Sequence, residues 1–163
     1  MNSRVLLVGV MMLGTLAGRP LSIAVPQISY PPAQVADLVG GTVQLPEGWT
    51  QKRTGTKDSF AGQIASGKGL IVNYDIGGNA GTRMSDQRIS ACKCIWYKER
   101  TLHGHLARIG LVETKAGREL AVTLFDTVQR FGMKYPANFW ATVQGDEDVA
   151  DTLLIALSYE AAP

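Results

Sequence analysis

Apolar and polar residues alternate in short segments from Gly41 onward, and turn residues separate these segments. A period of two is typical of strands that bury one face, because successive side chains of a strand point to opposite sides. The predicted strands are residues 42–45, a strand opening at Trp49, and residues 59–65, 70–76, 92–98, 102–113, 119–125 and 138–144. Residues 82–90 are polar and without a period, and residues 126–137 resemble a long loop containing Gly132 and Pro136.

The period changes after Gly145, where three consecutive acidic residues favour the start of a helix with Asp146 as its N-cap. Apolar residues then recur at helical spacing at Val149, Leu153, Ala156 and Leu157. The pattern predicts an α+β domain, in which an antiparallel sheet meander carries a C-terminal amphipathic helix packed on one face.

The N-terminal segment has the order of a secretory leader. A basic head with Arg4 precedes the uncharged apolar residues 5–18, and small residues follow up to Ala24. We therefore expect a signal peptide over residues 1–24 and an exported protein, periplasmic or extracellular; an uncleaved tether is the alternative. Residues 25–40 are expected to form a Pro-rich spacer and residues 41–163 a single α+β domain.

Removing the leader changes the charge of the chain. The leader holds two of the 16 basic residues and no acid, so 14 basic residues remain against 14 acidic ones. A net charge of zero gives no overall positive field, and we expect no nucleic-acid partner. The remaining chain is also expected to lack a stable membrane span.

Residues 45–49 read LPEGW, in which Gly48 turns the chain and Trp49 is expected to pack. Together with the meander and the terminal helix, this motif resembles the PsbP-like group of α/β/α sandwich proteins, which includes exported bacterial proteins of unknown function. The resemblance implies a mostly non-catalytic domain whose partners differ between members. It implies no particular functional residue here, since fold does not carry function.

Both cysteines and both histidines of the chain lie within residues 91–111, as Cys92, Cys94, His103 and His105. If residues 99–100 form the hairpin connection, Cys94 faces His105 across the strand pair, and two thiols and two imidazoles converge. A register shift by one residue would place them on opposite faces of the sheet.

Three interpretations of these four side chains remain open. Export to an oxidising compartment favours a Cys92–Cys94 disulfide, although residues two apart in a strand lie near the upper distance limit for a bridge. Two thiolates and two imidazoles would suit zinc or copper. Alternatively, the thiols fill the core and the histidines bond to the backbone. We expect no cofactor.

Catalytic motifs for a serine nucleophile or a zinc protease are missing from the sequence. Phe139 and Trp140 are neighbours in one strand, so one of them is a candidate for an exposed binding surface. The sequence favours an exported, non-enzymatic binding or accessory domain for an unknown protein or small molecule, which predicts an apolar groove on the sheet face away from the helix. A metal-binding or thiol-redox module is the alternative, and a polar cleft joining a histidine to an acid would favour a hydrolase.

Overall fold

The computed structural model describes residues 34–55, 60–77, 80–91, 93–130 and 132–162. The predicted signal peptide and residues 25–33 of the predicted spacer lie outside these ranges. The rest of that spacer prediction is wrong, because residues 34–37 form a strand and Leu38 is fully buried in the core. The folded domain therefore begins before Gly41.

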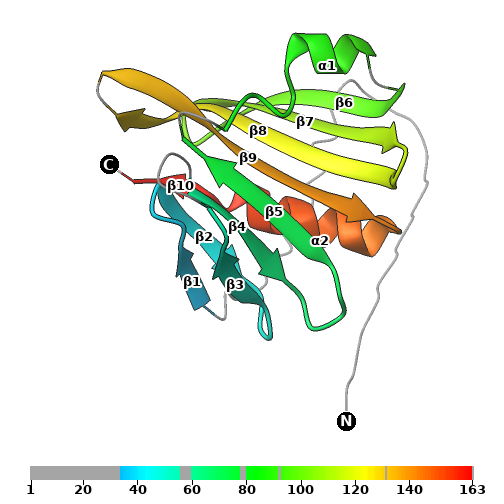
Figure 1. The fold of residues 1–163 in the computed structure, drawn as a ribbon, viewed down its shortest axis with the longest axis horizontal. Helices are drawn as coiled ribbons and strands as arrows, with labels where there is room; N and C mark the ends of the chain where they lie inside the picture. Colours follow the sequence, from blue (N-terminus) through cyan, green and yellow to red (C-terminus); the bar gives the residue numbers. More distant parts are fainter. Residues whose placement is uncertain (1–33, 56–59, 78–79, 92, 131, 163) are drawn as a thin grey trace, which may run out of the picture.

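Two sheets and two helices make up the domain (Figure 1). The small sheet has the order β1-β2-β10, and the large, strongly twisted sheet has the order β3-β4-β5-β9-β8-β7-β6, with antiparallel pairing throughout both sheets. The elements are β1 (Gln34–Asp37), β2 (Gly41–Leu45), β3 (Thr50–Arg53), β4 (Phe60–Ala65), β5 (Ile71–Ile76), α1 (Asp86–Ala91), β6 (Lys93–Leu102), β7 (His105–Thr114), β8 (Gly117–Arg130), β9 (Met133–Val143), α2 (Asp146–Leu157) and β10 (Glu160–Ala161).

Two segments without a sequence period differ from their prediction. Residues 82–90 contain the start of α1, a short helix that buries none of its residues and therefore carries no apolar stripe. Residues 126–137 are no long loop, because β8 continues to Arg130 and pairs directly with Met133 at the start of β9. Pro136 is accommodated where the β8–β9 register is irregular, one of the places in a sheet that tolerate a residue without an N–H.

The hairpin between β6 and β7 turns later than predicted. Its two turn residues are His103 and Gly104, which both have positive φ angles, 49° and 82°. Leu102 and His105 form the closing pair, so residues 99–100 lie inside β6 instead of connecting two strands. Positive φ at both central positions is typical of the type I′ turn that joins two twisted strands.

Alternation along the large sheet separates two faces. One face joins α2 and the small sheet in the main core, to which α2 contributes Ile155 and Ala156, both fully buried. The other face carries α1, and Figure 1 shows the two helices on opposite sides of the sheet.

The N-cap of α2 is Gly145 and not Asp146, and the side chain of Asp148 instead accepts a hydrogen bond from the Gln144 N–H at 2.7 Å.

No helix in the described part of the chain is long and apolar enough to span a membrane.

Candidate functional site

The predicted convergence of Cys94 with the two histidines is wrong. Cys94 pairs with Val112 at one end of the β6–β7 hairpin, whereas His105 pairs with Leu102 at the other end. His103 lies in the turn itself. Within the described ranges, no group of three or more metal-ligating side chains is suitably placed to hold an ion.

The Cys94 thiol points at the backbone instead. Its Sγ atom donates a hydrogen bond to the carbonyl oxygen of Trp96 at 3.2 Å, across a β-bulge between these two residues. Cys92 lies outside the described residues, so a Cys92–Cys94 disulfide stays a prediction.

The two neighbouring aromatic residues of β9 face opposite ways. Phe139 is fully buried, and its ring centroid lies 6.5 Å from that of Tyr74 and 5.5 Å from that of Tyr159. Trp140 lies on the α1 face, where the guanidinium of Arg83 covers its ring at 4.3 Å from the centroid. Trp140 is therefore half-buried beneath a charged side chain of its own protein.

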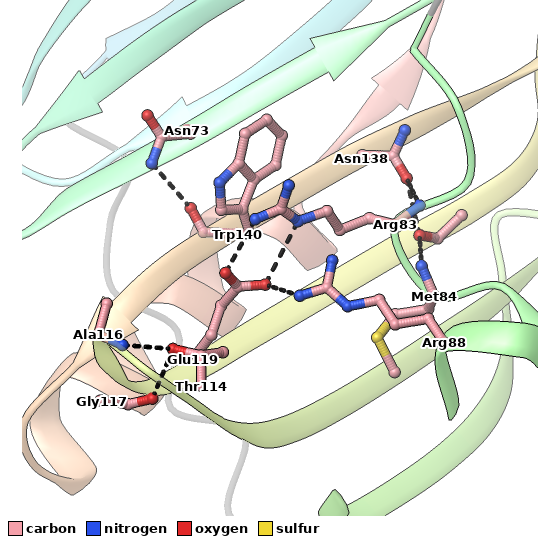
Figure 2. Close-up of polar contacts among 11 residues, drawn as sticks. Asn73, Arg83, Met84, Arg88, Thr114, Ala116, Gly117, Glu119, Asn138 and Trp140 are labelled. Atoms are coloured by element: carbon pink, nitrogen blue, oxygen red, sulfur yellow. Dashed lines mark hydrogen bonds and ion pairs between the residues drawn. The ribbon is translucent and has the colours of Figure 1, made fainter. Parts of the chain in front are cut away.

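Arg83 belongs to a charge cluster on the α1 face, which Figure 2 shows beside Trp140. The Glu119 carboxylate accepts hydrogen bonds from Arg83 Nη2 at 2.8 Å and from Arg88 Nη2 at 2.6 Å. The side chain of Glu119 is only 12% exposed. Removing such a carboxylate from water is costly unless it is paired, and the two arginines provide that pairing. This cluster joins the α1 segment to β8.

A second set of hydrogen bonds holds the chain just before α1 against the same sheet face. Thr123 Oγ1 donates to Asn138 Oδ1 at 2.7 Å, and both side chains are buried. Asn138 Oδ1 also accepts from the Arg83 N–H at 3.0 Å, while Asn138 Nδ2 donates to the Gly81 carbonyl at 2.9 Å. The Met84 N–H donates to Thr123 Oγ1 at 3.0 Å. These buried polar atoms bind the backbone and are not available to a ligand.

Tyr97 and Glu99 of β6 continue the hydrogen bonds and ion pairs of the α1 face. Glu99 Oε1 accepts hydrogen bonds from Tyr97 Oη at 2.6 Å and from Arg108 Nε at 3.0 Å. These two donors lower the pKa of Glu99. Burial, followed by the bond to Glu99, raises the pKa of Tyr97 to about 12. Arg108 also pairs with Asp86 of α1 at 2.7 Å, so this end of the sheet is held by matched charges.

The opposite face of β6 lines an open groove of about 700 Å³. We call it the β6–α2 groove. Its seven lining residues are Trp96, Lys98, Arg100, Leu102, Ile109, Leu153 and Leu157. The groove lies beside α2, and not on the sheet face away from the helix as the sequence suggested.

The spacing of these residues along β6 and α2 places their side chains together. The four β6 residues are spaced by two, so they share one face of the strand, and Leu153 and Leu157 are one helical turn apart on α2. Lys98 and Arg100 are exposed, and no carboxylate of the described residues pairs with either of them. The groove thus combines an apolar lining with two cations that have no carboxylate partner in the described part of the domain.

A hairpin turn at residues 99–100, as predicted from the sequence, leaves no room for this groove. The signal was present in the alternation of Trp96, Lys98, Arg100 and Leu102. With the turn at residues 103–104, this alternation predicts that the four side chains share one face of the strand.

A polar cleft of about 610 Å³ brings His105 into the same lining as Asp126. This is the arrangement that would favour a hydrolase, and the lining includes the hydroxyl of Thr127. That hydroxyl donates to the Tyr135 carbonyl at 3.3 Å, so it is directed at the backbone. Nucleophilic catalysis requires a base within hydrogen-bond reach of the nucleophile, and Thr127 has no such bond to His105 among the described contacts.

Comparisons with known proteins find a structural likeness. No protein-family model matches the chain, and no curated protein matches it. The solution structure of cyanobacterial PsbP (CyanoP) from Synechocystis sp. PCC 6803 is similar at a TM-score of 0.49 and 13% identity. The alignment covers 83% of this chain and 96% of CyanoP. CyanoP falls in the group that the sequence resembles, but a likeness at this level says nothing about partner or activity.

Proposed function

We propose that this protein is an exported, non-enzymatic binding domain and that the β6–α2 groove is its binding site. The observation that carries the proposal is the combination of an apolar groove of about 700 Å³ with Lys98 and Arg100 in its lining. The leader-like pattern of residues 1–24 supports export.

The size and lining of the groove favour a ligand that is apolar and negatively charged. Ligand pockets typically measure about 300–1,000 Å³ and combine an apolar surface with a few polar groups that orient the ligand. Trp96 offers a flat apolar surface, and two leucines of α2 line the same groove. The two cations attract an anion to the rim, where they supply specificity and a faster association rate.

The rest of the domain supports a role in binding over one in catalysis. The arginines of the α1 face are neutralised by Glu119, Glu99 and Asp86, so they stabilise the fold. The β6–α2 groove is different because its cations are left for another molecule.

The test is a titration of the full exported chain with the anionic apolar dye anilinonaphthalene sulfonate (ANS). Lys98→Glu reverses one charge in the groove, and Lys52→Glu makes the same change on the exposed strand β3, outside the groove. We expect Lys98→Glu to weaken dye binding roughly tenfold, while Lys52→Glu leaves it unchanged. Absence of dye binding to the wild type, or equal weakening in both variants, would overturn the proposal.

A further inference from the structure

We propose that the ligand of the β6–α2 groove is an extended peptide segment of a partner protein, which adds to the sheet as a strand beside β6 and carries acidic side chains opposite Lys98 and Arg100. This inference rests on the proposed function and names the partner class of the same site. Three features of β6 lead to it: its position, its backbone and its charges.

β6 is the last strand of the large sheet, and no strand of the described residues pairs with its outer edge. It is ten residues long. The other edge strands are much shorter, with four residues in β3, four in β1 and two in β10. Proteins keep exposed edges short because an unpaired edge is a template for another strand, so the length of β6 needs an explanation.

The hairpin geometry shows which backbone groups face that edge. Leu102 and His105 close a two-residue turn, so they form a hydrogen-bonded pair, and such pairs alternate with non-bonded pairs along the ladder. Tyr97, Glu99 and Thr101 therefore direct their N–H and C=O groups away from β7. The Glu99 carbonyl accordingly accepts a hydrogen bond from its neighbour Arg100, at 3.3 Å.

A strand added at this edge would extend the groove lining. Directly opposite residues share a face, so every second side chain of the added strand would lie beside Trp96, Lys98, Arg100 and Leu102 and over the leucines of α2. Backbone pairing would provide affinity, and the groove would select the side chains, which is how strand addition works in known recognition domains.

The charges favour an acidic peptide over a second copy of this chain. If two β6 strands paired about Glu99, Lys98 of each copy would lie opposite Arg100 of the other, and the two Glu99 side chains would also meet. Like charges directly opposite are destabilising, whereas acidic residues at those positions would be attracted to both cations.

The experiment measures binding of the peptide acetyl-LTETETL-amide to the full chain by calorimetry. This peptide places leucine and glutamate on one face and threonine on the other. Thr101→Pro removes an edge-directed N–H, and Thr101→Val changes the same side chain but keeps that N–H; Pro is tolerated on edge strands. We expect Thr101→Pro to weaken peptide binding roughly tenfold and Thr101→Val to leave it near the wild-type value.

A second measurement avoids any effect of proline on folding. The same peptide methylated on its central backbone nitrogen is expected to bind wild-type protein roughly tenfold more weakly, because one ladder hydrogen bond is lost. The lysine version, acetyl-LTKTKTL-amide, is expected not to bind. Equal binding of methylated and unmethylated peptides would overturn the strand-addition model.

Failure of this inference can be distinguished from failure of the proposed function. If ANS binds at the groove but the peptide does not, the strand-addition inference is wrong and the groove holds a small apolar anion; dodecanoate displacing the dye would identify an acyl chain. If neither ANS nor peptide binds, both proposals fail. A dimer in solution that dissociates with Thr101→Pro would show that a second copy occupies the edge, which also overturns the inference.

Discussion

The two faces of β6 differ in whether their charged side chains form ion pairs. On the α1 face, Glu99 accepts hydrogen bonds from Tyr97 and Arg108, and the nearby arginines all have carboxylate partners. On the α2 face, Lys98 and Arg100 flank an apolar groove, and no carboxylate of the described residues pairs with them. Neighbouring residues of a single strand thus serve different purposes. The paired face stabilises the fold, and the unpaired face is the one that we propose binds a partner.

The largest expected effect comes from breaking the paired face at its most buried point. Glu119→Gln leaves Arg83 and Arg88 without their shared carboxylate, and we expect the free energy of unfolding to fall by about 2 kcal/mol. Denaturant unfolding monitored by circular dichroism measures this loss. The control is Glu113→Gln, which breaks an exposed pair with Lys93 and is expected to cost less than about 1 kcal/mol. Equal losses would contradict a structural role for the buried cluster.

A smaller loss of stability is expected from Arg83→Lys, which keeps the positive charge but removes the planar guanidinium group. Arg83 covers the Trp140 ring and donates through two nitrogens to Glu119. A lysine cannot reproduce this geometry, so unfolding should be easier by about 1 kcal/mol, and the near-ultraviolet signal of Trp140 should change. Unchanged stability and an unchanged aromatic spectrum would show that the stacking contributes nothing.

Tyr97→Phe tests the pH dependence of the paired face. The carboxyl pKa of Glu99 is lowered by its bonds to Tyr97 and Arg108, so the stability it contributes is present above the unfolded-state pKa and is lost as pH falls through the folded-state pKa. Removing the tyrosine hydroxyl should raise the pKa of Glu99 and shrink the loss of stability on acidification. Carboxyl carbon chemical shifts, followed from neutral to acidic pH, measure the pKa of Glu99 in the wild type and in the variant. A pKa that stays at its wild-type value in the variant would show that the hydroxyl has no influence.

The smallest effect on stability is expected on the unpaired face. Arg100→Gln removes a cation that has no carboxylate partner in the described residues, so the free energy of unfolding should stay within about 0.5 kcal/mol of wild type. The same variant should bind ANS more weakly. A clear loss of stability would mean that Arg100 stabilises the fold and would weaken the contrast between the two faces.

Much of the sheet could be predicted from alternation alone. Ala107, Ile109 and Leu111 are buried on one face as their spacing indicates, and Trp49 packs in the core as the LPEGW motif indicates. Helix α1 escaped prediction because it buries no residue and so has no apolar period. Of the residues predicted to form the apolar stripe of α2, Ala156 is fully buried, and Val149, Leu153 and Leu157 pack partly buried against the core. Thr152 and Ile155 are buried as well, so the core-facing surface of the helix is broader than predicted.

The candidate site depended on features that alternation does not reveal. His103 and Gly104 form the β6–β7 turn in left-handed conformations. The interpretation of the two histidines as strand residues that bind a metal placed the turn elsewhere. The bulge between Cys94 and Trp96 then changes which residues of β6 share a face, so a register taken from the sequence could not be correct at both ends. The groove also needs Leu153 and Leu157 from α2, whose position relative to β6 only the fold determines.

The most direct test uses the indole N–H signals of the three tryptophans during titration of the full chain with ANS, followed by nitrogen–proton correlation spectroscopy. Trp96 lines the β6–α2 groove, Trp140 lies under Arg83 on the paired face, and Trp49 is buried in the core. Binding in the groove predicts that the Trp96 signal shifts in a saturable manner while the other two stay in place. A shift of Trp140 with an unmoved Trp96 would place binding on the paired face and contradict it.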